Sequence, residues 1–226
     1  MSNRARLIET RVPRDPQAVV LVLHGGASRA ESMMVSPTQL SVLRMVPIAR
    51  RVARAGRGRL AVFRLLNSTR GWDTSHTPVD DVTWALGELR QRFGGDLPTG
   101  LVGHSLGGRA ALLAADQPAV RSAVALAPWV YETDGAGLDL SGRHVLVVHG
   151  DQDRIASPRR SAVVADALRR TTDVGYVRIA GGKHAMLRHG STFDRIASDF
   201  VTATLLGREA GHPVSDVLAG ERLVVV

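Results

Sequence analysis

Short apolar runs recur along the chain, each too short for a helix and bounded by polar or glycine-rich segments. Runs of this length that are apolar throughout are typical of strands buried on both faces of a sheet. They predict strands over residues 18–24, 59–66, 99–105, 120–129, 143–150 and 174–182, and the mixed segment 5–12 is also interpreted as a strand.

Between these runs, apolar residues recur at the three-to-four-residue spacing of a helix with one buried face. This spacing predicts helices over residues 39–55, 78–93, 106–116, 158–171 and 192–206. Gly56 follows the first of them as a natural stop, and Pro47 inside it predicts that the helix begins or kinks there.

Alternation of buried strands and helices predicts an α/β protein whose mostly parallel central sheet carries helices on both faces. In such sheets, ligands and chemistry gather at the carboxyl ends of the strands. The polar and glycine-rich motifs of this chain follow predicted strands, so we expect them to meet at one edge of the sheet.

Composition narrows the class of protein. A length of 226 residues with 44% hydrophobic content suits one globular domain, and we take residues 1–206 as that domain. There is no cysteine, which excludes disulfides and a cysteine nucleophile. No run is long enough to span a bilayer, and the first residues lack the apolar core of a signal peptide, so we expect a cytoplasmic protein without membrane contact.

A net charge of +8 raises the question of nucleic-acid binding. Lys183 is the only lysine among the 29 basic residues, and the arginines are scattered along the chain rather than gathered in one block. Two tyrosines and four phenylalanines leave little material for base stacking. We therefore expect no nucleic-acid partner.

The segment Gly103-His104-Ser105-Leu106-Gly107 has the form G-x-S-x-G and lies between a predicted strand and a predicted helix. On such a sharp turn, side chains two residues before and after the serine would clash, so glycine is needed there. The pattern indicates Ser105 as a nucleophile and the Leu106 N–H as one donor of an oxyanion hole. A glycine-rich packing turn is the alternative, and we interpret His104 as a buried structural histidine.

A second donor is expected from another strand end. His24-Gly25-Gly26 follows the strand at 18–24, and we take Gly26 as the donor, with Ala27 as the alternative. A plain strand-ending turn would also explain these glycines.

A serine nucleophile needs a base, and the base needs a residue that orients it. His184 lies in a loop after the strand at 174–182, shortly after Gly181 and Gly182, and is our candidate base; His189 is second. Asp151 and Asp153 lie two positions apart after the strand at 143–150, and either is placed to orient the base.

Together the segments HGG, GHSLGG, HGDQDRIASP and GGKHAM resemble the α/β-hydrolase superfamily, most closely its small bacterial serine hydrolases of the dienelactone-hydrolase and esterase group. The resemblance implies a three-layer α/β-hydrolase fold. It also implies Asp153 as the acid, since the acid of that group usually follows a G-x-x-D spacing. The 13 residues that separate ALAPW from RHVLVV leave no room for an inserted cap domain. Residues 207–226 form a C-terminal extension, expected to pack on the body or to be flexible.

The resulting hypothesis is a serine hydrolase that cleaves small carboxylic esters or thioesters through an acyl-enzyme intermediate. Acyl transfer or cofactor-free perhydrolysis by the same residues is the alternative, and a non-catalytic binding protein of this fold is a third reading. The chain shows no metal or nucleotide motif, so no cofactor and no metal are expected. We expect a monomer or a homodimer. Three aromatic residues are candidates for the substrate-binding walls: Trp72, Trp129 and Tyr131.

Overall fold

The computed structural model describes residues 5–26, 35–69 and 77–226 of the chain. Within these residues, eight strands form one sheet in the order β1-β3-β2-β4-β5-β6-β7-β8. The pairs are parallel except that β1 runs antiparallel to β3. The strands are β1 (Arg6–Arg11), β2 (Ala18–Leu23), β3 (Leu60–Leu66), β4 (Thr99–His104), β5 (Val120–Leu126), β6 (His144–Gly150), β7 (Val174–Ile179) and β8 (Leu223–Val225).

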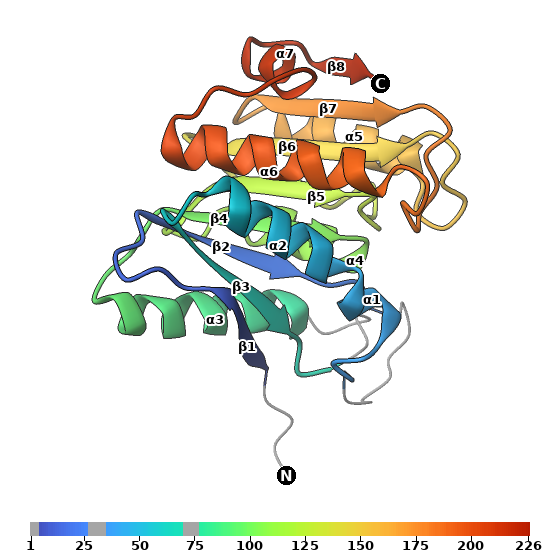
Figure 1. Cartoon of the computed structure of the whole chain (residues 1–226). Helices are drawn as coiled ribbons and strands as arrows, with labels where there is room; N and C mark the ends of the chain where they lie inside the picture. The colour runs from blue at the N-terminus through green and yellow to red at the C-terminus, as the bar shows by residue number, and fades with distance from the viewer. Residues whose placement is uncertain (1–4, 27–34, 70–76) are drawn as a thin grey trace.

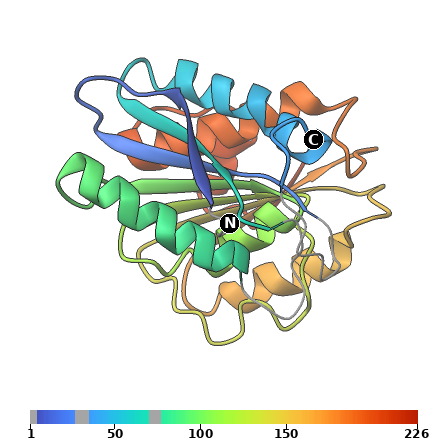
Figure 2. The same cartoon turned by 90° about the horizontal axis from the view of Figure 1, so that it is seen from below.

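Helices cover both faces of this sheet, as Figures 1 and 2 show. One face packs against α2 (Met45–Ala55) and α6 (Gly190–Leu206), and the other against α3 (Thr77–Phe93), α4 (Leu106–Leu113) and α5 (Pro158–Leu168). Each central strand therefore buries side chains on both faces, and all six residues of β2 are buried. This is why the strands are apolar throughout rather than alternating. The predicted three-layer α/β fold is confirmed.

The predicted elements differ from the observed ones mainly at their ends. The helix predicted over 39–55 is two helices, α1 (Leu40–Leu43) and α2, separated by Arg44, and Pro47 lies in the first turn of α2. A proline is tolerated there because the first N–H groups of a helix have no partner within it. The helix predicted over 106–116 ends at Leu113, three residues early.

Between β5 and β6 the chain forms only turns and loops, so no cap domain is inserted. The expectation of a capless fold is confirmed. No helix within the described ranges has the length and the apolar character needed to cross a membrane.

The C-terminal extension adds α7 (Val214–Leu218) and β8 to the sheet edge beside β7. Val214 is fully buried, and Gly175 of β7 lies so close to Val217 that a Cβ there would be 2.0 Å from its Cγ1. Figure 1 shows α7 and β8 against the β7 edge. The extension is thus packed on the domain through a helix and a strand.

Candidate active site

Ser105 lies on a strained turn between β4 and α4. Its φ and ψ are 56° and −119°, a backbone conformation rare for a residue with a side chain. A Cβ on Gly103 would lie 2.0 Å from the Gly107 carbonyl oxygen, and one on Gly107 would lie 2.5 Å from the Leu23 oxygen. Both glycines are therefore required by the close approach of backbone, and the turn presents the serine at the carboxyl end of β4.

His184 contacts Ser105 through one ring nitrogen and Asp153 through the other. The Ser105 Oγ lies 3.0 Å from His184 Nε2, and His184 Nδ1 lies 2.8 Å from Asp153 Oδ2. The serine follows β4, the aspartate follows β6 and the histidine follows β7. The three side chains, 31 and 79 positions apart in the chain as measured from His184, meet at one edge of the sheet, as parallel strands require.

Two glycines bring the loops of Asp153 and His184 together. A Cβ on Gly150 would lie 2.3 Å from backbone atoms of Gly182. The Gln152 N–H donates to the Gly182 carbonyl, and the Asp151 N–H donates to that of Ile179. The turn after β6 is therefore held directly against the turn after β7.

The two aspartates of this turn differ in what their carboxylates contact. Asp151 is exposed and accepts a hydrogen bond from the Gly181 N–H (2.8 Å), so it joins the two turns. Asp153 is buried, and besides His184 its carboxylate accepts from the N–H groups of Ile155 and Ala156. The structure thus brings Asp153, and not Asp151, to the histidine.

Asp153 is ionised in this environment. Burial raises the pKa of its carboxyl, but hydrogen bonds from His149, His184 and the two backbone N–H groups outweigh that effect and hold the pKa well below its usual range. A carboxylate accepts only, so His184 carries its proton on Nδ1, and its Nε2 is free to accept from the Ser105 hydroxyl.

Of the two residues predicted as oxyanion-hole donors, Leu106 follows Ser105 in the chain, and Gly26 follows Gly25, which lies close to Ser105. Leu106 is the first residue of α4, where N–H groups have no partner within the helix. Gly26 lies just past β2, and the preceding Gly25 would place a Cβ 3.3 Å from the Ser105 Cβ. Ala27, the alternative donor, is outside the described residues.

His24 holds the segment that carries Gly26. Its Nε2 accepts from the Asn67 N–H (3.1 Å), so its Nδ1 carries the proton and donates to the Gly25 carbonyl (2.6 Å). Burial lowers the pKa of His24, which keeps the ring neutral and fixed in this tautomer. The end of β2 is thereby tied to the end of β3.

The remaining histidines have other surroundings. His104 is buried, donates from Nε2 to the His184 carbonyl (2.9 Å) and packs with its ring centroid 5.0 Å from that of His184. His189 precedes the first turn of α6 and is not the histidine bonded to Ser105.

Trp129 and Tyr131, two of the predicted substrate-wall residues, follow β5 and pack edge to face with ring centroids 5.0 Å apart. The backbone N–H of Trp129 donates to the Ser105 carbonyl (3.1 Å), so Trp129 lies beside the nucleophile's backbone, and Tyr131 is 44% exposed. Trp72, the third, is outside the described residues.

A buried ion pair supports these aromatic residues. Arg109 of α4 binds the Asp134 carboxylate through Nε (2.7 Å) and Nη2 (2.9 Å). Asp134 also accepts from the Tyr131 N–H, and the Arg109 guanidinium lies 4.8 Å from the Tyr131 ring centroid. Sequence reasoning missed this pair, because nothing in the spacing of the two residues links them.

An open hollow of about 690 Å³ borders His184 and Asp153 and is lined by exposed Arg154, Ile155 and Lys183. Within residues 127–143, which join β5 to β6, no cap segment is present to cover it. Within the described part of the chain, no group of three or more histidine and acidic side chains is arranged to hold a metal ion.

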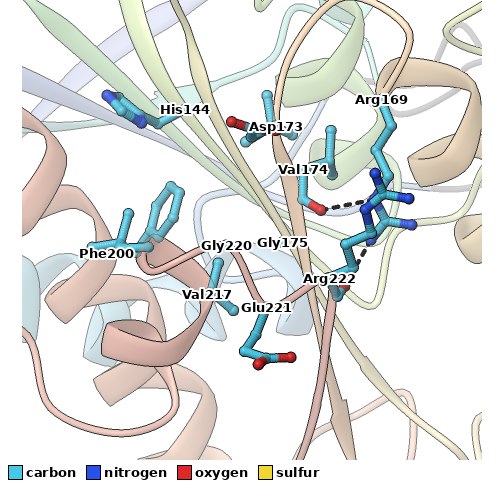
Figure 3. Close-up of a pocket in the computed structure, with 12 residues that line it drawn as sticks. His144, Arg169, Asp173, Val174, Gly175, Phe200, Val217, Gly220, Glu221 and Arg222 are labelled. Carbon is cyan, nitrogen blue, oxygen red and sulfur yellow. Dashed lines mark hydrogen bonds between the residues drawn. The ribbon is translucent and has the colours of Figure 1, made fainter.

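A second pocket, of about 180 Å³, lies at the opposite end of the sheet and is shown in Figure 3. It includes His144 and Val174, the first residues of β6 and β7, together with Val217 and Glu221 of the extension. None of the predicted site residues lines it, so we place the candidate active site at the carboxyl ends of the strands.

His149 is a further residue near the site whose role sequence reasoning missed. It is fully buried in β6, and its Nε2 lies 3.2 Å from the same Asp153 oxygen that His184 contacts. The only signal in the sequence is a histidine within an otherwise apolar run, four residues before Asp153.

Solved structures share this fold. Est1E from Butyrivibrio proteoclasticus, in a structure with bound ferulic acid, is 17% identical over 90% of this chain and 95% of its own (TM-score 0.64). A putative dienelactone hydrolase from Klebsiella pneumoniae subsp. pneumoniae is 16% identical over 90% and 99% (TM-score 0.63). An α/β serine hydrolase without a lid from Xanthomonas campestris is 19% identical over 85% of each chain (TM-score 0.59).

No curated protein matches the sequence. A family model does: residues 89–204, just over half of the chain, match the PETase model, described as PET hydrolase-like. This range includes Ser105, Asp153 and His184. The predictions of an α/β hydrolase and of an enzyme that acts on ester bonds are confirmed at the level of family and fold, and the chain belongs to the PET hydrolase-like family.

Proposed function

We propose that this protein is a serine hydrolase that cleaves carboxylic esters or thioesters through a covalent acyl-enzyme. One observation carries the proposal: the continuous hydrogen-bonded arrangement of Ser105, His184 and Asp153, with contacts of 3.0 and 2.8 Å. Membership of a hydrolase family and the strained turn at Ser105 support it.

In the first half-reaction, the Ser105 oxygen attacks the carbonyl carbon of the ester while His184 Nε2 takes the hydroxyl proton. Asp153 holds the ring by its Nδ1–H and stabilises the imidazolium that forms. The imidazolium then gives the proton to the departing alkoxide or thiolate, which leaves the acyl group on Ser105.

The carbonyl oxygen becomes negatively charged as Ser105 attacks. We assign its stabilisation to the N–H groups of Leu106, at the positive end of α4, and of Gly26. In the second half-reaction, His184 takes a proton from water, and the resulting hydroxide displaces the serine oxygen to release the acid. Serine regains its proton from His184.

The open surroundings favour small esters and exposed ester groups over substrates that need enclosure. Trp129 and Tyr131 offer an aromatic wall beside the serine, which suits an acyl group with an aromatic ring. The ferulic acid bound in the Est1E structure has an aromatic ring, and the matching family is described as PET hydrolase-like, which supports an aromatic acyl group in the substrate.

The test is turnover of p-nitrophenyl esters of increasing chain length and of a terephthalate diester by purified protein. We expect turnover that is lost in Ser105→Ala, with the melting temperature nearly unchanged. Ser191→Ala, at an exposed serine of α6, is the matched control and should behave as wild type. Equal turnover in Ser105→Ala and wild type would contradict the proposal, and acyl transfer to added alcohol instead of water would redirect it to an acyltransferase.

A further inference from the structure

His149 is a fully buried polar residue at the end of β6, among strand residues that are apolar. A buried imidazole is costly unless both of its nitrogens find partners. Here Nδ1 lies 2.8 Å from the Ser161 hydroxyl of α5, and Nε2 lies 3.2 Å from Asp153 Oδ2. Both nitrogens therefore have partners, and the partner of Nε2 is the Asp153 carboxylate, which also contacts His184.

The protons of this group can be placed from its contacts. The Asp153 carboxylate can only accept, so His149 Nε2 carries a proton and donates to it. Ser161 Oγ also lies 2.9 Å from the Tyr176 hydroxyl and 2.9 Å from the Pro158 carbonyl. In the neutral ring, Ser161 donates to Nδ1 and accepts from the Tyr176 hydroxyl, so both imidazole nitrogens of His149 have a partner.

Asp153 Oδ2 thus serves two imidazoles at once. Oδ1 accepts from the Ile155 and Ala156 N–H groups, which fixes the plane of the carboxylate. At Oδ2, the His149 contact at 3.2 Å withdraws part of the negative charge that would otherwise act on His184 at 2.8 Å. The strength of the Asp153–His184 interaction therefore depends on His149.

We propose that His149 is a positioning residue of this active site: with Ser161 and Tyr176 behind it, it holds Asp153 Oδ2 toward His184 and shares the charge of that oxygen. This inference rests on the proposed function, in which His184 is the base. It assigns to β6 and α5 a direct part in setting the basicity of His184.

Removal of His149 should change the interaction between Asp153 and His184 in one direction. Without its hydrogen bond, Asp153 Oδ2 presents more negative charge to His184 and stabilises the imidazolium that forms when His184 takes a proton. The direction is the same whether His149 is neutral or charged, because a nearby positive charge would also be lost. Asp153 and His104 contact His184, and Lys183 precedes it in the chain. Arg44 acts on His104 and Arg178 acts on Tyr176. The substitution alters none of these groups.

The test compares His149→Leu with His149→Gln in the full-length protein. The glutamine amide nitrogen can donate to Asp153 from about the place of Nε2, whereas leucine cannot. Histidines labelled with ¹³C are titrated by NMR without substrate, and the His184 signal is assigned by its absence in His184→Gln. We expect the imidazolium form of His184 to persist to higher pH in His149→Leu than in wild type, and this difference to be smaller in His149→Gln.

Kinetics with a p-nitrophenyl ester give the second readout. For His149→Leu we expect kcat to fall about tenfold with KM nearly unchanged, and the acidic limb of the kcat/KM profile to move to higher pH. Tyr176→Phe, which keeps the ring and removes the hydroxyl, should shift both readouts less and in the same direction.

The outcomes separate the two proposals. Unchanged titration of His184 and an unchanged pH profile in His149→Leu would overturn the role of His149 while leaving the hydrolase standing. Absence of any Ser105-dependent turnover would overturn the hydrolase, and the NMR titration would still decide whether His149 acts on His184. If His149→Leu does not fold, His149→Asn gives the same decision, because the asparagine amide takes the place of Nδ1 and does not reach Asp153 as Nε2 does.

Discussion

At the scale of single residues, the site depends on which atoms of neighbouring side chains face each other. Asp151 and Asp153 are two positions apart, yet one carboxylate joins two backbone turns and the other contacts His184. The sequence favoured Asp153 only through the resemblance to a family, because spacing alone does not say which way a loop turns. The hydrogen bonds of Asp153 to Ile155 and Ala156 supply that direction.

Exchange of each aspartate for asparagine separates their roles. We expect Asp153→Asn to lower kcat by about 10³–10⁴, since the amide no longer holds His184 in the required tautomer. Asp151→Asn is the matched control and should retain turnover within a few-fold, with a lower melting temperature. A larger loss of kcat in Asp151→Asn than in Asp153→Asn would contradict the assignment of the acid.

His104 predicts how stability depends on pH. Burial lowers the pKa of His104 to about 3, and the neighbouring His184 acts in the same direction. Between pH 6.5 and pH 3, His104 is protonated in the unfolded chain and neutral in the folded protein. His104 therefore does not lower the free energy of unfolding above pH 6.5, and it lowers that free energy progressively as the pH drops from 6.5 toward 3.

Urea unfolding at pH 7 and pH 5 measures this effect. His104 should account for about 2 kcal/mol of the loss of unfolding free energy between the two pH values. We expect His104→Gln, which can still donate to the His184 carbonyl, to lose correspondingly less. His144→Gln, at an exposed histidine, is the control and should lose as much as wild type. Identical losses in wild type and His104→Gln would contradict this account.

At the scale of elements, the site exists because loops after β4, β6 and β7 end at the same edge of the sheet. The turn at Ser105 and the order of strands and helices were predictable from the sequence, since glycine spacing and apolar runs reflect local sterics and burial. The contact between Gly150 and Gly182 and the ion pair between Arg109 and Asp134 were not, because they join segments distant in the chain without a local pattern.

The Arg109–Asp134 pair yields a prediction for stability. Both side chains are 8% exposed, so removal of one leaves the other as a buried charge without its partner. We expect Asp134→Ala to lower the free energy of unfolding by about 3–5 kcal/mol and to weaken ester turnover by releasing Tyr131. The control is Asp139→Ala, an exposed carboxylate of the same loop. Equal stability of the two variants in urea would show that the pair does not support this loop.

At the scale of the whole molecule, the domain is a sheet without a cap between β5 and β6. The candidate site lies at the carboxyl ends of the strands, and the C-terminal extension lies along the lateral edge beside β7. The absence of a cap followed from the short segment between the strands at 120–129 and 143–150. The extension was expected to pack or to be flexible, and β8 was not predicted as an element. Its three residues carry no periodic pattern, and their strand conformation comes from pairing with β7.

Removal of residues 208–226 should therefore destabilise the domain without touching the site. The loss of Val214 and Val224 from the core and the exposure of the β7 edge should lower the free energy of unfolding by about 3 kcal/mol. Turnover per folded molecule at 25 °C should be near that of the full chain. Val214→Ala tests the same packing by a single change, with Leu218→Ala, 41% exposed, as its control. Unchanged stability on truncation would contradict the packing role.

The central claim, that Ser105 is the nucleophile, is tested most directly by covalent labelling. The full-length protein is incubated with a fluorophosphonate, digested, and the modified peptide is identified by mass spectrometry. The account predicts one adduct per chain, on Ser105, slowed strongly in His184→Gln and absent in Ser105→Ala. An adduct on another residue, full labelling of Ser105→Ala, or no labelling of the folded wild-type protein would contradict it.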